Sequence, residues 1–248
     1  MLRTVLENRN EMKASNKTTV ILGLSILSLA ILTFGFSRLT QSQSPQSTPD
    51  EHKRIIDAIR RGGLREAAKI KGHYVGIHDP NWDWANFTIE ALTKASVAVV
   101  VGSPEYAAPE LSSTGDSIDT HFVVRISEVI KGGSRFSVGD AIFVSLPGGK
   151  LDFDDGTSAE VQTPGFESMA MGKQYVLFLY QNRNGSNVLL LTGGPQGLFE
   201  LQPNGKTKSH ARPTDTVTKD ADNKDRESFL NVVRTLAKKW PQASGCCN

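Results

Sequence analysis

Residues 119–149, DTHFVVRISEVIKGGSRFSVGDAIFVSLPGG, decide the fold. Hydrophobic and polar residues alternate on both sides of a glycine-rich corner, and the stretch ends in Pro147-Gly148-Gly149. Alternation with a period of two indicates strands with one buried face. We therefore expect a long strand, a corner and a second strand. The register of the first strand should slip once near Ser127, because Val129 and Ile130 cannot both follow the same period.

Further strands are predicted on both sides of this pair. VAVVVG (97–102) is a continuous β-branched run, whereas residues 103–118 are rich in Pro, Gly and Ser and are predicted to form a surface loop. Residues 151–162 predict a hairpin around Asp155-Gly156. YVLFLY, NVLLLT and GLFELQ predict three later strands. The result is a mainly β domain over residues 96–202 with five to seven strands.

Helical segments flank this domain. Residues 50–95 are predicted to be a helical and aromatic lead-in, whose first helix, 50–61, is N-capped by Asp50 and ends at Gly62-Gly63. Residues 203–224 are predicted to be a polar linker, and 225–241 a C-terminal helix with its apolar residues at helical spacing. The tail, 242–248, holds both cysteines, Cys246 and Cys247. A frayed end is the simpler interpretation, and a strained vicinal disulfide is the alternative.

The N-terminal region predicts an anchored, exported protein. Residues 20–36 carry no charge and are just long enough to span a bilayer, so we expect a cytoplasmic N-terminus (1–17), a transmembrane signal-anchor (18–36) and a polar linker (37–49). The body would then lie outside the cytoplasm, tethered to the membrane by this helix. A signal peptide that starts at Met12 and is later cleaved is the alternative, and a buried cytosolic helix is a third.

Overall charge bears on the class of partner. The chain of 248 residues has 28 basic and 26 acidic side chains, a net charge of +2. This balance predicts no basic face for nucleic acid. The two terminal cysteines can provide neither a disulfide framework nor a cysteine-based metal site within the domain.

The order AVVVG, FVV, EVIKG, VGDAIFV, PGG, PGF, GKQYVLFL and GGPQGLF carries a resemblance. Over about residues 96–201 the chain resembles a widespread β-domain, without an assigned function, of exported bacterial proteins. At fold level it is similar to oligonucleotide/oligosaccharide-binding (OB) barrels and to the netrin-like domain of tissue metalloproteinase inhibitors. The resemblance implies an OB-like small barrel or sandwich. Those inhibitors chelate zinc through an N-terminal cysteine, which this chain lacks.

Three motifs are candidates for chemistry. His73, His78 and Asp79 are suitable zinc ligands, followed by Trp82 and Trp84, but a solvated aromatic connector explains the tract more simply. The acidic residues of 152–160 would suit Ca²⁺, although their spacing fits a turn better. The glycine-rich 193–197 lacks the following helix that a phosphate site needs.

No catalytic or cofactor-binding residue can be assigned from these motifs, which favours a non-enzymatic function. We expect a binding or scaffolding module of the cell envelope, with an envelope protein as partner. The alternatives are a metal-dependent envelope hydrolase that uses His73, His78 and Asp79, and an inhibitor of secreted proteases.

Overall fold

The structure is a computed structural model that describes residues 48–79, 86–181 and 187–241. In these residues it contains ten strands in two sheets, four α-helices and one 3-10 turn, so the predicted mainly β class is confirmed. No helix in the described ranges is both long and apolar enough to cross a membrane. The predicted anchor 18–36, the two tryptophans Trp82 and Trp84, and the terminal cysteines lie outside these ranges.

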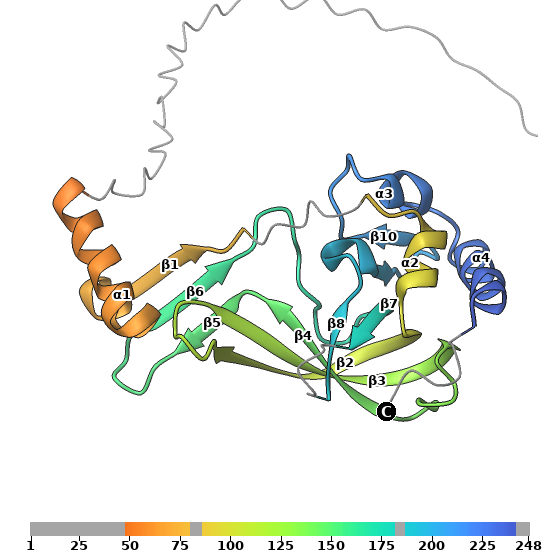
Figure 1. The fold of residues 1–248 in the computed structure, drawn as a ribbon, viewed down its shortest axis with the longest axis horizontal. Helices are drawn as coiled ribbons and strands as arrows, with labels where there is room; N and C mark the ends of the chain where they lie inside the picture. Colours follow the sequence, from red (N-terminus) through yellow and green to blue (C-terminus); the bar gives the residue numbers. More distant parts are fainter. Residues whose placement is uncertain (1–47, 80–85, 182–186, 242–248) are drawn as a thin grey trace, which may run out of the picture. The chain divides into compact units, whose positions relative to one another are not determined.

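The larger sheet has seven strands in the order β10-β9-β7-β2-β3-β4-β8 (Figure 1). Neighbours pair antiparallel, except β4 and β8, which are parallel. Strand β8 also pairs with β7, so the pairings of β7, β2, β3, β4 and β8 form a closed circuit, and all five strands contribute to one core. The bounds are β2 Ala98–Leu111, β3 Ile118–Lys131, β4 Ala141–Pro147, β7 Gln174–Gln181, β8 Val188–Leu191, β9 Leu198–Leu201 and β10 Thr207–Ser209.

Strand β2 is longer than predicted, and the expected surface loop over 103–118 is largely wrong. Residues 103–111 continue the strand, and only 112–117 form the turn into β3. The reason lies in the pairing of β2. It pairs with β7 only as far as Gly102, and beyond that residue it pairs with β3 alone. Pro104 and Pro109 are tolerated because a proline at an open strand edge removes no ladder hydrogen bond.

Strand β3 contains the register slip predicted at Ser127. Val101 pairs with Glu128 and Gly102 with Ile126, so Ser127 is the extra residue of a bulge. Its hydroxyl donates a hydrogen bond to the Val101 carbonyl at 3.2 Å. A second irregularity leaves Ile130 unpaired between the next two pairs.

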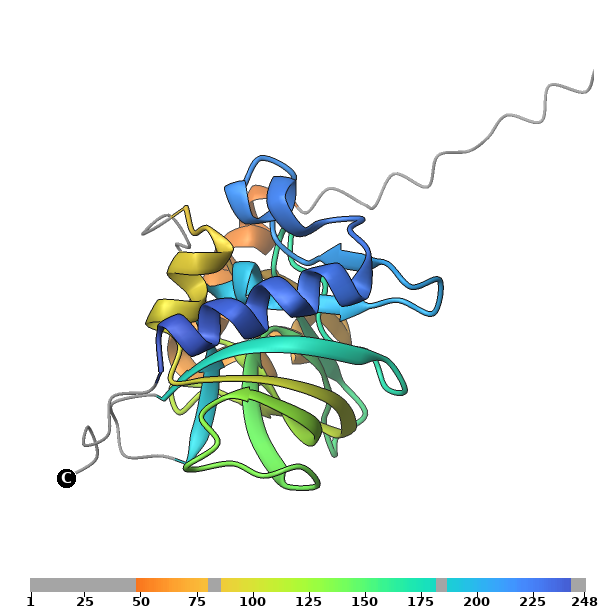
Figure 2. The ribbon, with the colours of Figure 1, turned by 90° about the vertical axis from the view of Figure 1, so that its right-hand side faces the viewer.

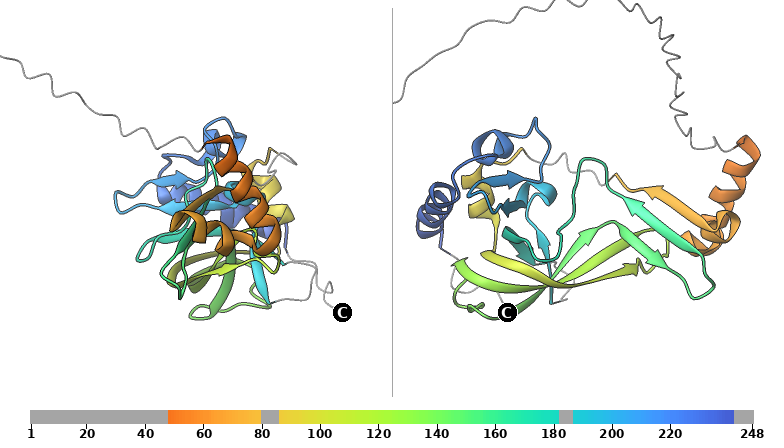
Figure 3. Two further views of the ribbon diagram at one scale, coloured as in Figure 1. Left: turned by 90° about the vertical axis from the view of Figure 1, so that its left-hand side faces the viewer. Right: turned by 180° about the vertical axis from the view of Figure 1, so that it is seen from behind.

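The smaller sheet packs with helix α1 (Pro49–Lys71) at the end of the β2–β3 hairpin that bears the turn (Figures 1 and 3). Its order is β1 (His73–Ile77), β6 (Ser158–Gln162) and β5 (Gly149–Asp152), with β1 parallel and β5 antiparallel to β6. The predicted hairpin around Asp155-Gly156 is therefore confirmed. Leu64, Ala68, Ile118, Phe153, Ala159 and Val161 form the local core.

Helix α1 differs from its prediction at the N-terminus. Thr48, not Asp50, is the N-cap, since its hydroxyl accepts from the Glu51 amide and Pro49 occupies the first turn. Gly62 and Gly63 have non-helical backbone angles, so the first helical segment ends there as predicted, and a second segment of α1 continues beyond the kink. The Leu64 amide donates to the Gly115 carbonyl at 2.7 Å, which joins the kink to the β2–β3 turn.

Helices α2 (Ile89–Ala95), α3 (Thr216–Ala221) and α4 (Arg226–Lys239) cover the other end of the larger sheet (Figure 2). Their apolar side chains pack on Val99, Val101, Val176, Phe178 and Phe199 to form a further core. The predicted polar linker 203–224 is wrong, because it contains β10 and α3. Both elements are too short to show a hydrophobic period in the sequence, and their polar residues favour the prediction of a linker.

Candidate functional site

The three residues predicted as metal ligands do not come together. His73 and His78 bracket β1, so they are about 17 Å apart along the strand and face opposite sides. His73 Nδ1 lies 2.7 Å from the Ser158 hydroxyl, and Asp79 is exposed beyond the strand end. Over the described ranges, no three His, Cys, Asp or Glu side chains gather in a way that could hold a metal ion.

The acidic residues of the β5–β6 hairpin serve separate structural contacts. Asp155 accepts hydrogen bonds from the amide and hydroxyl of Thr157, which lower its pKa, and Gly156 follows with a φ of 80°. Asp154 pairs with Arg65 at 2.7 Å. These contacts confirm that the sequence DDG builds a turn.

The glycine-rich segment 193–197 is also structural. Residues Gly194–Gly197 form a buried 3-10 turn between β8 and β9. The Gln196 side chain accepts a hydrogen bond from the Phe87 amide at 2.9 Å and so fixes the chain that leads into α2. A buried turn of this kind offers no surface to a phosphate.

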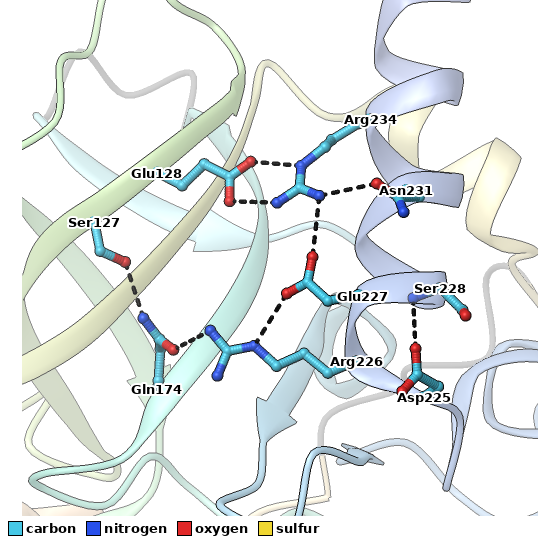
Figure 4. Close-up of polar contacts among 9 residues, drawn as sticks. All are labelled: Ser127, Glu128, Gln174, Asp225, Arg226, Glu227, Ser228, Asn231 and Arg234. Atoms are coloured by element: carbon cyan, nitrogen blue, oxygen red, sulfur yellow. Dashed lines mark hydrogen bonds and ion pairs between the residues drawn. The ribbon is translucent and has the colours of Figure 1, made fainter. Parts of the chain in front are cut away.

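Three polar residues of β3, Ser127, Glu128 and Lys131, attach helices to the sheet. Glu128 receives a bidentate pair from Arg234 of α4, with distances of 2.7 and 2.9 Å (Figure 4). Arg234 also reaches Asn231 and Glu227. Figure 4 shows a second connection from Ser127 through Gln174 to Arg226, the first residue of α4; its two hydrogen bonds measure 3.0 and 2.7 Å.

Lys131 attaches β3 to another helix. It is only 6% exposed, and its ammonium donates to the Thr93 carbonyl at 2.7 Å and the Lys94 carbonyl at 3.4 Å. These carbonyls belong to the last turn of α2, where a cation is favourable. Burial lowers the pKa of Lys131.

A buried polar cluster surrounds His210, which follows β10. Its Nδ1 donates to the Glu167 carbonyl at 2.6 Å, so in the neutral ring Nε2 is the acceptor nitrogen. Nε2 is enclosed, has no hydrogen-bond partner among the described residues, and lies 3.9 Å from Glu200 Oε2. That distance permits an ion pair but is too long for a hydrogen bond.

Burial dominates the electrostatics of this cluster. It lowers the pKa of His210 and raises that of Tyr175, whose ring packs edge-on against the imidazole. Lys173 pairs with Glu200 at 3.0 Å, which raises the lysine pKa. The side chains of His210, Glu200 and Tyr175 are almost fully enclosed, so the cluster cannot contact a substrate.

An apolar row crosses the outer side of the closed strand circuit, and it is the best candidate for a functional surface. Tyr106 pairs with Val123, Val123 with Phe143, and Phe143 with Val188, so the four side chains lie on one face of β2, β3, β4 and β8. Tyr106 is 62% exposed and Phe143 51% exposed. Two strand spacings place these aromatic residues about 10 Å apart. We call these four residues the apolar row.

Charged side chains beside the apolar row are already paired. Arg125 forms a fork with Glu105, with its closest approach at 2.9 Å, and the contact lowers the glutamate pKa. His121 lies 3.4 Å from Glu110. Burial raises the pKa of neighbouring Asp119, while the charges of His121 and His78 oppose the shift. The face therefore combines apolar side chains with polar side chains that already have partners.

Two hollows lie elsewhere on the surface. One, of about 680 Å³, lies between α2 and α4 and is lined by the apolar residues Ile89, Phe229, Val232 and Leu236. The other, of about 540 Å³, is bounded by the smaller sheet and residues 163–168. Neither brings together groups that suggest a reaction.

No family model matches the sequence, and a search of curated proteins likewise finds no match.

Sequence reasoning did not identify the apolar row, for two reasons. The prolines around Tyr106 predict a loop there, which hides its place in a strand. Phe143 lies in AIFVSLP, where both faces carry apolar side chains, so the pattern does not show which face is outward. Only the register across four strands aligns these residues.

Proposed function

We propose that this protein is a membrane-anchored, exported binding module of the cell envelope, without catalytic activity, that holds a polypeptide partner on the apolar row. The observation that carries the proposal is the alignment of Tyr106, Val123, Phe143 and Val188 on one exposed face. Exposed aromatic residues grouped in this way are typical of interaction surfaces.

The strand pairings support an OB-like barrel. Five strands close into a circuit, and five is the number of strands in an OB barrel. OB folds bind ligands on the outer face of their second and third strands. In chain order the strands of the circuit are β2, β3, β4, β7 and β8, so the second and third are β3 and β4. These two strands carry Val123 and Phe143 at the centre of the apolar row. The position of the row therefore matches the position of ligand faces in such barrels.

The charges around the row favour a polypeptide over nucleic acid. Arg125 and His121 already contact Glu105 and Glu110, so these described basic side chains are not available to a phosphate backbone. An apolar row with polar pairs at its margin resembles the core and rim of a protein interface. The anchor predicted over 18–36 would present this face to other envelope proteins.

Site-specific photocrosslinking in the native host tests the proposal. A photoreactive phenylalanine at position 106 or 143 should give an adduct of the same mass, whereas the same residue at Val138 should not. Val138 is a matched control because it is apolar and 66% exposed but lies outside the row. Val123→Lys should reduce both adducts at least tenfold in a protein whose circular dichroism spectrum is unchanged. Equal labelling at all three positions, or adducts insensitive to Val123→Lys, would contradict the proposal.

A further inference from the structure

Strand β1 is an open edge of the smaller sheet. The order of that sheet is β1-β6-β5, and in the described residues β1 pairs only with β6 (Figure 1). An open edge presents a row of unpaired amide and carbonyl groups that can accept another strand. The backbone groups of β1 that remain free follow from its hydrogen bonds to β6.

Two hydrogen bonds fix the direction of every backbone group in β1. The Ser158 amide donates to the Gly72 carbonyl at 3.0 Å, and the His78 amide donates to the Gln162 carbonyl at 2.9 Å. In a parallel ladder, alternate residues face the same neighbour. The even-numbered residues of β1 therefore face β6. The amides and carbonyls of His73, Val75 and Ile77 point away from it, and none has a partner within the described ranges.

The side chains on this edge do nothing to discourage pairing. Val75 is 46% exposed and Ile77 74% exposed, on the same face of the strand. Residues 73–77, HYVGI, contain no lysine, carboxylate, proline or bulge, which are the usual protections of an edge strand. Its only protective feature is its short length.

The edge of the larger sheet offers a direct contrast. The outer side of β10 is covered by residues 222–224. The Thr207 amide donates to the Lys224 carbonyl, the Asn223 amide to the Thr207 carbonyl, and the Ser209 amide to the Asp222 carboxylate. The protein thus covers the β10 edge with its own chain and leaves the β1 edge uncovered in the described residues.

We propose that β1 pairs antiparallel with β1 of a second copy of this chain, with the two-fold axis at Val75. In this register Val75 of one copy faces Val75 of the other, and His73 of each copy faces Ile77 of the other. Each of these three positions has its backbone groups directed outward, so the pairing forms six hydrogen bonds and leaves none of the six outward amides unpaired.

The edge is self-complementary in this register, which favours a second copy of the chain as the partner. No residue of HYVGI carries a fixed charge, so two identical edges meet without repulsion. The valine and isoleucine side chains of both copies lie on one face and form a shared apolar patch, consistent with an isologous interface. If the chain is anchored in a membrane, the high local concentration assists an interface of only five residues per copy. The pairing does not depend on what binds the apolar row.

The test uses the full chain in mild detergent, with Cys246→Ser and Cys247→Ser to prevent disulfide links, and measures mass by sedimentation equilibrium. The wild type should form dimers. Val75→Pro removes only an outward amide, which an edge strand tolerates, so the protein should fold and its dimer Kd should rise at least tenfold. Val138→Lys, at an exposed apolar site off this edge, should leave the Kd unchanged.

A charge exchange identifies the paired strands. Val75→Lys and Val75→Glu should each be monomeric, because like charges would lie directly opposite, and an equimolar mixture should recover the dimer. A monomeric wild type would overturn the proposal, as would dimers that persist in Val75→Pro with an unchanged Kd. Two single variants that both stay dimeric, or a mixture that stays monomeric, would equally exclude this register. Pairing of β1 with an extended segment of another protein would correspond to the monomeric outcome.

Discussion

Replacing Lys131 by methionine should destabilise the protein by about 1–2 kcal/mol. Methionine keeps the length of the buried stem but removes the donor to the Thr93 and Lys94 carbonyls. A hydrogen bond from a charged donor contributes about 1.5–3 kcal/mol. The lowered pKa of Lys131 shows that burial penalises its ammonium, so the substitution also removes a cost and the net loss is smaller.

Thermal unfolding measures this loss. For a folded unit of roughly 200 residues, the unfolding entropy is about 0.4 kcal/mol/K, so 1–2 kcal/mol corresponds to a Tm lower by about 2–5 °C. Circular dichroism of the full chain in detergent, with urea titration at constant pH, gives both quantities. Lys94→Met is the matched control. This lysine lies in α2, the helix that Lys131 contacts, but its side chain is exposed and its ammonium lies 4.6 Å above the Trp240 ring. It should cost at most about 1 kcal/mol.

The reasoning would be refuted if Lys131→Met were as stable as the wild type or more stable. That result would mean that burying the ammonium costs as much as the hydrogen bonds to α2 contribute. Lys131→Arg separates charge from shape. It keeps the cation but changes the donor geometry, so it should be less stable than the wild type if the directed contact to Thr93 is what matters.

Three further predictions concern other contacts. A double-mutant cycle with Glu128→Gln and Arg234→Met should give a coupling of about 1 kcal/mol, as expected for a partly exposed bidentate pair, and a coupling near zero in urea titrations would contradict it. Because burial lowers the pKa of His210, the unfolded chain takes up its proton first. The contribution of neutral His210 to the free energy of unfolding should be complete above about pH 6.5 and should decline below it, by at most about 1.4 kcal/mol per pH unit. A His210→Gln protein whose stability declines equally between about pH 7.5 and pH 5 would exclude this. Gly63→Ala should cost at least about 2 kcal/mol, because Gly63 has a φ of 72° and its added Cβ would collide with the Gly115 carbonyl; an unchanged Tm would show that the α1 kink does not matter.

The strands were predictable where burial imposes a simple period. The predicted strands ending at Lys131 and starting at Ala141 occur in the structure, as does the slip at Ser127. The second half of β2 was not predictable, because prolines argue against a strand unless its edge is known to be open. That knowledge requires the position of β7, which lies about 70 residues further along the chain.

The candidate site was less accessible to sequence reasoning than the fold. The suggested metal ligands His73 and His78 are near each other in sequence but face opposite sides of β1. The members of the apolar row come from four strands, and only pairing brings them into line. Interactions between distant residues leave no local pattern, so a site that depends on them cannot be read from one sequence.

The two irregularities of β3 explain why EVIKG carries the residues that hold the helices. Ile126 faces the core inside the strand circuit, and a regular strand would direct Glu128 into that core as well. The bulge at Ser127 reverses this alternation, so Glu128 lies opposite Val101 on the side that bears the helices. Residues three apart on a regular strand face opposite sides, yet Lys131 lies opposite Val99 on that same side, because Ile130 is skipped. The bulges place a carboxylate under α4 and an ammonium under α2. The motif therefore specifies how this end of the sheet receives its helices, and the apolar row lies further along the same outer side of the circuit.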